Sequence, residues 1–122
     1  MKILAPLLLL SLFAFHAIAQ ALPPPTATLT WTAVTQYSDG TTIPSTVTVT
    51  YNVYQGTSAT SLTKVASGVT ALTSSISTGL ADGQTYFWAV TAVAGGLESA
   101  QSNVGTKVFA AIAPGTVTLT VK

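Results

Sequence analysis

The sequence has no cysteine and no arginine, a single histidine, and few charges of either sign. Charged residues make up 6% of the 122 residues, with four basic side chains against three acidic ones. The absence of cysteine excludes a disulfide framework and thiolate metal sites. Because arginine is absent and the formal net charge is only +1, the chain offers no phosphate-binding stripe. We therefore expect no nucleic acid partner.

Side chains that could carry catalysis are equally scarce. The one histidine, His16, lies in an N-terminal segment that we expect to be removed. The remainder then lacks both the usual general base and the strongest nucleophile. Its carboxylates are Asp39, Asp82 and Glu98, without an Asp-rich calcium loop. We predict that the protein is not an enzyme and has no catalytic residue, no metal site and no cofactor.

The N-terminus has the pattern of a secretory signal peptide over residues 1–19. Lys2 precedes an apolar run over residues 3–18, and small residues place the cleavage site before Gln20 or before Leu22. The alternative is a membrane anchor, but the run is short for a span and contains a proline. Loss of Lys2 would leave three lysines against three acidic residues, a neutral mature chain. We expect a periplasmic or extracellular location and a mature chain that does not span a membrane.

After a proline-rich spacer (residues 20–25), two stretches alternate with a period of two. Residues 26–34 place Ala27, Leu29 and Trp31 on one face with threonines on the other. Residues 47–55 repeat this pattern, with Tyr51 and Val53 inward and Tyr54 outward. Such alternation is typical of half-buried antiparallel strands.

The stretch over residues 80–93 combines a tight turn with a third strand. Asp82-Gly83 suits the turn because glycine adopts positive φ without steric cost. Tyr86, Trp88 and Val90 then share one strand face. Leu80, Gly83 and Tyr86 have the spacing of a tyrosine corner, in which the tyrosine hydroxyl bonds back to the preceding turn.

Together these motifs resemble the fibronectin type III family over residues 26–109. They are Leu29-x-Trp31, Tyr51-x-Val53, Leu80-x-x-Gly83-x-x-Tyr86 and Glu98-Ser99, followed by Ser102-Asn103. The resemblance implies an all-β, immunoglobulin-like antiparallel β-sandwich. It also implies a structural core formed by Leu29, Trp31, Tyr51, Val53, Leu80, Tyr86, Trp88 and Val90.

The middle of the domain has a register conflict. In the family, the inward residues before the corner leucine lie at odd offsets from it, whereas Leu72 and Ile76 lie at even offsets from Leu80. Because a slip of one residue turns a strand inside out, we predict a bulge near residues 77–79. Residues 62–66 are expected to form a short edge strand.

The two ends of the domain also depart from the family pattern. Too few residues precede position 26 to form strand A, whereas residues 110–122 provide a linker and an extra alternating strand with Val117, Leu119 and Val121 on one face. This strand covers the edge that strand A would cover, extends the opposite edge, or pairs with a neighbouring molecule.

In the family, partners are commonly bound by two loops, the B–C loop (here residues 35–45) and the F–G loop (here residues 94–103). The resemblance implies that both loops emerge at one end of the sandwich. The candidate binding residues there are Tyr37, Asp39, Leu97 and Glu98. Tyr37 and Leu97 could instead fold onto the sandwich end. Tyr54 and Phe87, outward on adjacent strands, are candidate exposed aromatics.

The function predicted from these features is that of a non-catalytic exported binding or spacer module at a bacterial or phage-associated surface. Its partner would be a protein or glycan at a cell or virion surface, and an oligomer is compatible with the sequence. The alternatives are a structural subunit that assembles by C-terminal strand donation and an accessory carbohydrate-binding module.

Overall fold

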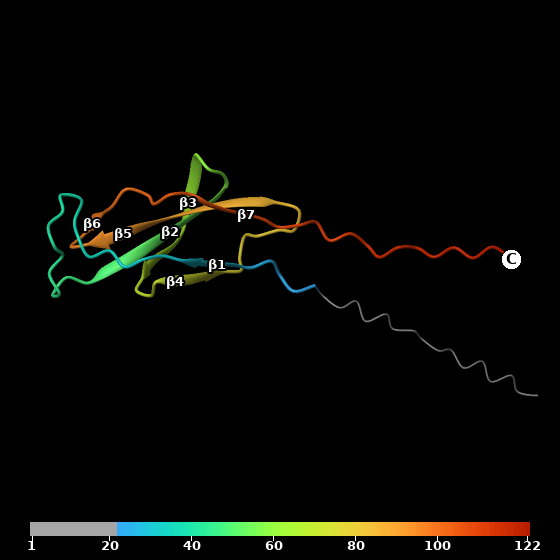
Figure 1. Cartoon of the computed structure of the whole chain (residues 1–122), viewed down its shortest axis with the longest axis horizontal. Coiled ribbons are helices and arrows are strands. Elements are labelled where there is room, and N and C mark those ends of the chain that lie inside the picture. Colours follow the sequence, from blue (N-terminus) through green and yellow to red (C-terminus); the bar gives the residue numbers. More distant parts are fainter. Residues whose placement is uncertain (1–21) are drawn as a thin grey trace, which may run out of the picture.

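The computed structural model describes residues 22–122, so the predicted signal peptide lies outside the described residues. Two antiparallel sheets face each other (Figure 1). The smaller pairs β1 (Ala27–Thr30) with β4 (Thr73–Ile76). The larger has the order β3 (Ser61–Val69), β2 (Val49–Ser58), β5 (Thr85–Ala94), β6 (Leu97–Glu98), with β7 (Gly105–Val108) also paired to β5. The described chain is therefore an all-β sandwich, as predicted, and it has no helix that could cross a membrane.

The core lies between the two sheets and is built mainly from β2 and β5. Val53 is fully enclosed, and Trp88 and Tyr86 are 3% and 8% exposed. Ala27, Ile76 and Phe109 complete the buried cluster, and Leu29, Trp31, Leu80 and Val90 pack against it while only partly buried. The family resemblance placed Trp31 in the core, but its side chain is only half-buried at one side of the cluster. Its ring centre lies 5.5 Å from that of Tyr51.

The predicted tyrosine corner is present between β4 and β5. The Ala81 amide donates to the Tyr86 hydroxyl at 3.0 Å. Gly83 takes a φ of 77° in the turn, a conformation that glycine adopts without a Cβ penalty. The corner directs Tyr86 into the core, where its ring and that of Phe109 form a T-shaped pair with centres 5.9 Å apart.

The predicted change of strand register before the tyrosine corner occurs in the loop after β4, not as a bulge within a pair of strands. β4 ends at the buried Ile76, and a bend follows in which Gly79 has a φ of 69°. The bend returns Leu80 to the core, so it performs the correction expected of a bulge. Leu72 precedes β4, and its side chain is 42% exposed. The sequence pattern had placed this side chain inward.

The two ends of the described chain lie at the same end of the sandwich. β1 begins there, and after β7 the backbone of Phe109 bonds to the corner turn through Gln84 and Gly83. The Lys107 ammonium donates to the Thr26 carbonyl at 2.9 Å. Residues 110–122 then run away from the sandwich without joining a sheet (Figure 1). The expected extra strand therefore covers neither edge of its own domain.

Candidate binding site

The end of the sandwich opposite the chain termini, called the loop end below, consists of loop residues 35–45 and turn residues 95–96. Within this loop the Tyr37 amide donates to the Thr41 carbonyl at 2.8 Å, and Gly40 has a φ of 85°. Asp39 accepts hydrogen bonds from the Thr41 hydroxyl at 2.6 Å and the Thr41 amide at 2.9 Å. These bonds, the hydroxyl foremost, lower the pKa of Asp39. Asp39 therefore shapes the turn while remaining exposed.

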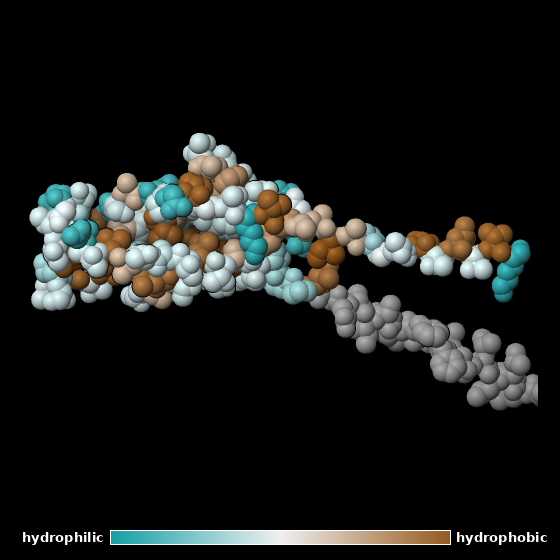
Figure 2. All heavy atoms as spheres, viewed as in Figure 1, coloured by the Kyte–Doolittle hydropathy of each residue, from teal (hydrophilic) through white to brown (hydrophobic). Residues whose placement is uncertain are grey.

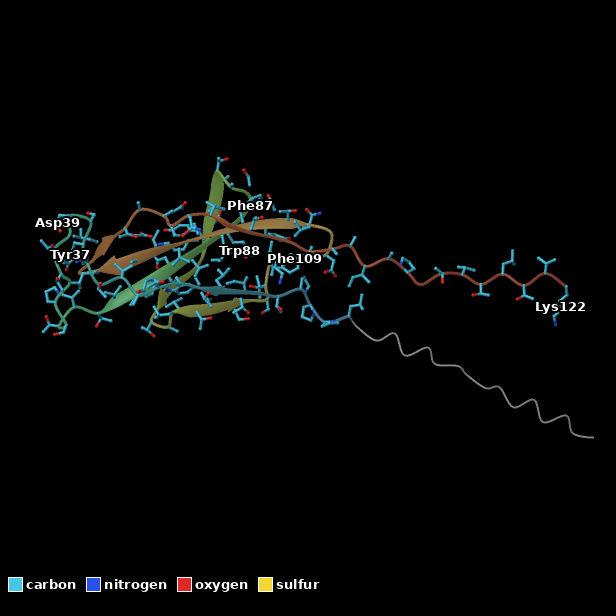
Figure 3. All side chains as sticks on the ribbon, viewed as in Figure 1. Tyr37, Asp39, Phe87, Trp88, Phe109 and Lys122 are labelled. Atoms are coloured by element: carbon cyan, nitrogen blue, oxygen red, sulfur yellow. The ribbon has the colours of Figure 1, made fainter. Side chains whose placement is uncertain are left out.

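A small apolar pocket of about 130 Å³ lies at the loop end, and it brings Tyr37 and Leu97 together. Val34, Ile43 and Ala94 also line it. Tyr37 is half-buried, whereas Leu97 is 70% exposed, an unusual position for a large apolar side chain. Figure 3 shows Tyr37 and Asp39 at this extreme of the molecule, far from Phe109. Of the four candidate loop residues, Tyr37, Leu97 and Glu98 thus line one pocket, and Asp39 lies in the same loop as Tyr37.

Glu98 also has hydrogen-bond partners within the domain. Its Oε1 accepts hydrogen bonds from Tyr54 OH at 2.5 Å, Thr91 Oγ1 at 2.6 Å and Asn52 Nδ2 at 3.0 Å. The Thr91 bond is the main cause that lowers the pKa of Glu98 to about 2, and the Lys64 ammonium, 4.0 Å from Oε2, adds least. The carboxylate thus ties β6 to β2 and β5.

The two candidate aromatics share the outer face of the large sheet. Tyr54 pairs with Ala89, and Phe87 pairs with Gly56 on the same strands. The Tyr54 hydroxyl is bound to Glu98, and the Lys64 ammonium lies 5.6 Å from its ring centre. A sugar ring would have to displace this lysine to stack on Tyr54, and Phe87 is half-buried.

A second, larger cavity than the Leu97 pocket was not among the predicted sites. We call it the edge groove: a volume of about 690 Å³ between residues 28–34 on one side and residues 99–105 on the other. Its floor is apolar and includes Trp31, Tyr51, Trp88, Val90 and Ala92. Figure 2 shows apolar residues in brown along the middle of the body, between paler strips. The sequence signal for this groove was the missing strand A.

One wall of the edge groove is a strand with an unpaired edge. Within the described chain β1 pairs only with β4. The Trp31 amide donates to the Leu72 carbonyl, and the Leu29 carbonyl accepts from the Thr73 hydroxyl, so these odd-numbered residues direct their backbone groups toward β4. Because backbone groups alternate along a strand, those of Thr28 and Thr30 point to the open edge.

The other wall is held to β5 by two serines that repeat one arrangement. The Ser99 amide donates to the Ala92 carbonyl while the Ala92 amide donates to Ser99 Oγ, at 2.8 and 2.9 Å. Ser102 does the same with Val90, at 2.9 Å for both bonds. The side chains thus replace carbonyls of a regular ladder, and this wall stays in place without continuous strand pairing.

Residues 22–122 contain no group of three or more His, Cys, Asp or Glu side chains placed to hold a metal ion.

The chain is similar to a solved structure described as a Fn3-like protein from Clostridium thermocellum. The two share 27% sequence identity with a TM-score of 0.54, over 73% of this chain and 81% of that chain. No protein-family model matches the sequence, and no curated protein matches it. This similarity and the sandwich topology identify the domain as fibronectin type III-like, as the sequence motifs indicated.

Proposed function

We propose that this fibronectin type III-like domain is a non-catalytic exported binding module that presents its loop end to a protein partner at a bacterial or phage-associated surface. The observation that carries the proposal is the position of Leu97, 70% exposed beside a small apolar pocket and next to Tyr37. An exposed large apolar residue beside a tyrosine is typical of a protein contact. Export is supported by the residue pattern of the N-terminal segment.

The positions of the chain ends favour a terminal binding head over a spacer. A spacer between two domains needs its ends on opposite sides, whereas here the Lys107–Thr26 hydrogen bond joins the segments that enter and leave the sandwich. The proline-rich residues 22–25 begin at that same end (Figure 1). A domain tethered there points its loop end outward.

Site-specific photocrosslinking in the producing cells tests this proposal. A benzophenone amino acid at Leu97 should yield a discrete adduct with a protein other than this chain. The matched control is Val65 on β3, which is also apolar and is 48% exposed. Absence of an adduct from Leu97, or equal adducts from both positions, would contradict the proposal.

A further inference from the structure

We propose that the edge groove is an acceptor site for the C-terminal strand of a second copy of this chain, residues 116–121. This inference concerns the edge groove, which adjoins the Leu97 pocket at Val34, and it does not depend on the partner proposed there. The resulting contact joins the tail of one copy to the groove of the next.

The groove is suited to an extended strand. On its β1 side it runs over residues 28–34, a length of about 20 Å at the rise of a strand. Thr28 and Thr30 direct free backbone groups to this edge, so a strand laid there completes a ladder. The Trp31 indole N–H is buried without a hydrogen-bond acceptor in the described chain, which indicates that this side of the core is incomplete.

Residues 116–121 have the complementary pattern. Val117, Leu119 and Val121 are 93%, 82% and 83% exposed, although together they would form one apolar face of a strand. The intervening threonines match the exposed threonines of β1. Laid beside β1, the three apolar side chains would face Trp31 and Val90 while the threonines face water.

The tail of the same chain is poorly placed to fill the groove. It leaves the sandwich at the end where β1 begins, so it must first travel the whole groove before it can run antiparallel to β1. Residues 110–115 reach about 20 Å when fully extended, which leaves nothing for the reversal. An immediate reversal would place the strand parallel to β1, a slightly less stable pairing.

A second copy in the same orientation removes this difficulty. Its tail points away from its own sandwich (Figure 1) and would enter the next groove from the loop end. It would then run antiparallel to β1, in the position and direction of the missing strand A. Such a tail-to-groove contact is heterologous and does not close on itself, so it generates a linear series of copies.

Paired variants test the inference on the chain as isolated from the producing cells. Leu119→Asp removes the donor, because it places a charge on the face that enters the groove. Thr30→Pro removes the acceptor, since proline eliminates an N–H on the open edge and leaves the β4 ladder intact. Thr118→Asp, on the outward face of the tail, is the matched control.

Light scattering after size-exclusion chromatography should show concentration-dependent oligomers for the wild type and for Thr118→Asp. Each blocked variant alone should remain monomeric, and an equal mixture of the two should form a 1:1 complex, because one retains the tail and the other the groove. Circular dichroism verifies that Thr30→Pro is folded. If it is not, Thr28→Pro replaces it, because Thr28 is the other groove residue whose N–H faces the open edge.

A wild type that stays monomeric at all concentrations, or folded blocked variants that form no 1:1 complex, would overturn the inference. Loss of the Leu97 adduct alone would leave it standing, because that experiment concerns a protein other than this chain.

Discussion

At the scale of single residues, Glu98 is a predicted binding residue whose carboxylate also has hydrogen bonds within the domain. Its carboxylate collects three hydrogen bonds from β2 and β5, which lower its pKa to about 2 from the ordinary 4.5. A carboxylate with a depressed pKa stabilises the folded state fully above its unfolded pKa and loses that effect as pH falls toward its folded pKa. The stabilisation is therefore present at neutral pH and is lost between about pH 4.5 and pH 2.

We predict that Glu98→Gln unfolds at lower urea concentration than the wild type at pH 7 and that the two midpoints converge as pH falls from about 4.5 to 2. Urea titrations at a series of pH values measure this difference. Because Asp39 is present in both proteins, its own lowered pKa cancels in the comparison. A gap that is constant from pH 7 to pH 2 would show that the charge of Glu98 is not what stabilises the fold.

At the scale of secondary structure elements, the segment over residues 99–104 depends on side chains where a strand would use its backbone. Ser99 and Ser102 each accept an amide of β5. We predict that Ser99→Ala and Ser102→Ala each cost about 1 kcal/mol, a typical net value for one hydrogen bond. Amide hydrogen exchange should become faster at Ala92 in the first variant and at Val90 in the second. Ser75→Ala is the control, because Ser75 is an exposed serine on β4, away from these bonds. Equal exchange rates at Ala92 and Val90 in all three variants would contradict the role of the two serines.

The sequence predicted those elements whose pattern is local. Period-two alternation located β2 and β5, and the Leu80, Gly83, Tyr86 spacing located the corner, because both depend on neighbouring residues. β1 was predicted over residues 26–34 but ends at Thr30. The Val34 amide bonds to the Tyr51 hydroxyl instead of to a strand, a contact between residues far apart that no local pattern contains.

The candidate site was predictable only in part, for the same reason. The meeting of Tyr37 and Leu97 followed from the family resemblance, which places their loops at one end. Glu98 accepts hydrogen bonds from Asn52, Tyr54 and Thr91. These three side chains lie close together only because of the register between β2 and β5, which composition and spacing do not give. Phe109 was taken as the end of the domain, yet it is buried against Tyr86 because the chain turns inward after β7.

At the scale of the whole molecule, the sandwich is closed on one side and open along the edge groove. Trp88 is only 3% exposed and its indole N–H donates to Gln55 at 2.9 Å, although it also lines the edge groove. The open side leaves Trp31 half-buried on the groove floor. The two tryptophans of the chain therefore differ in their exposure to solvent, and Trp31 has more exposure to lose than Trp88 if a donated strand filled the groove.

This difference gives an optical test of assembly. We predict that the tryptophan emission of the wild type shifts to shorter wavelength as concentration rises, because an inserted strand removes Trp31 from water while Trp88 is already buried. Thr30→Pro, which blocks the groove edge, should show no shift over the same range. In Trp31→Phe the shift should vanish even where light scattering shows that assembly persists. A shift of equal size in Trp31→Phe would assign the change to Trp88 and would contradict the prediction that an inserted strand covers Trp31.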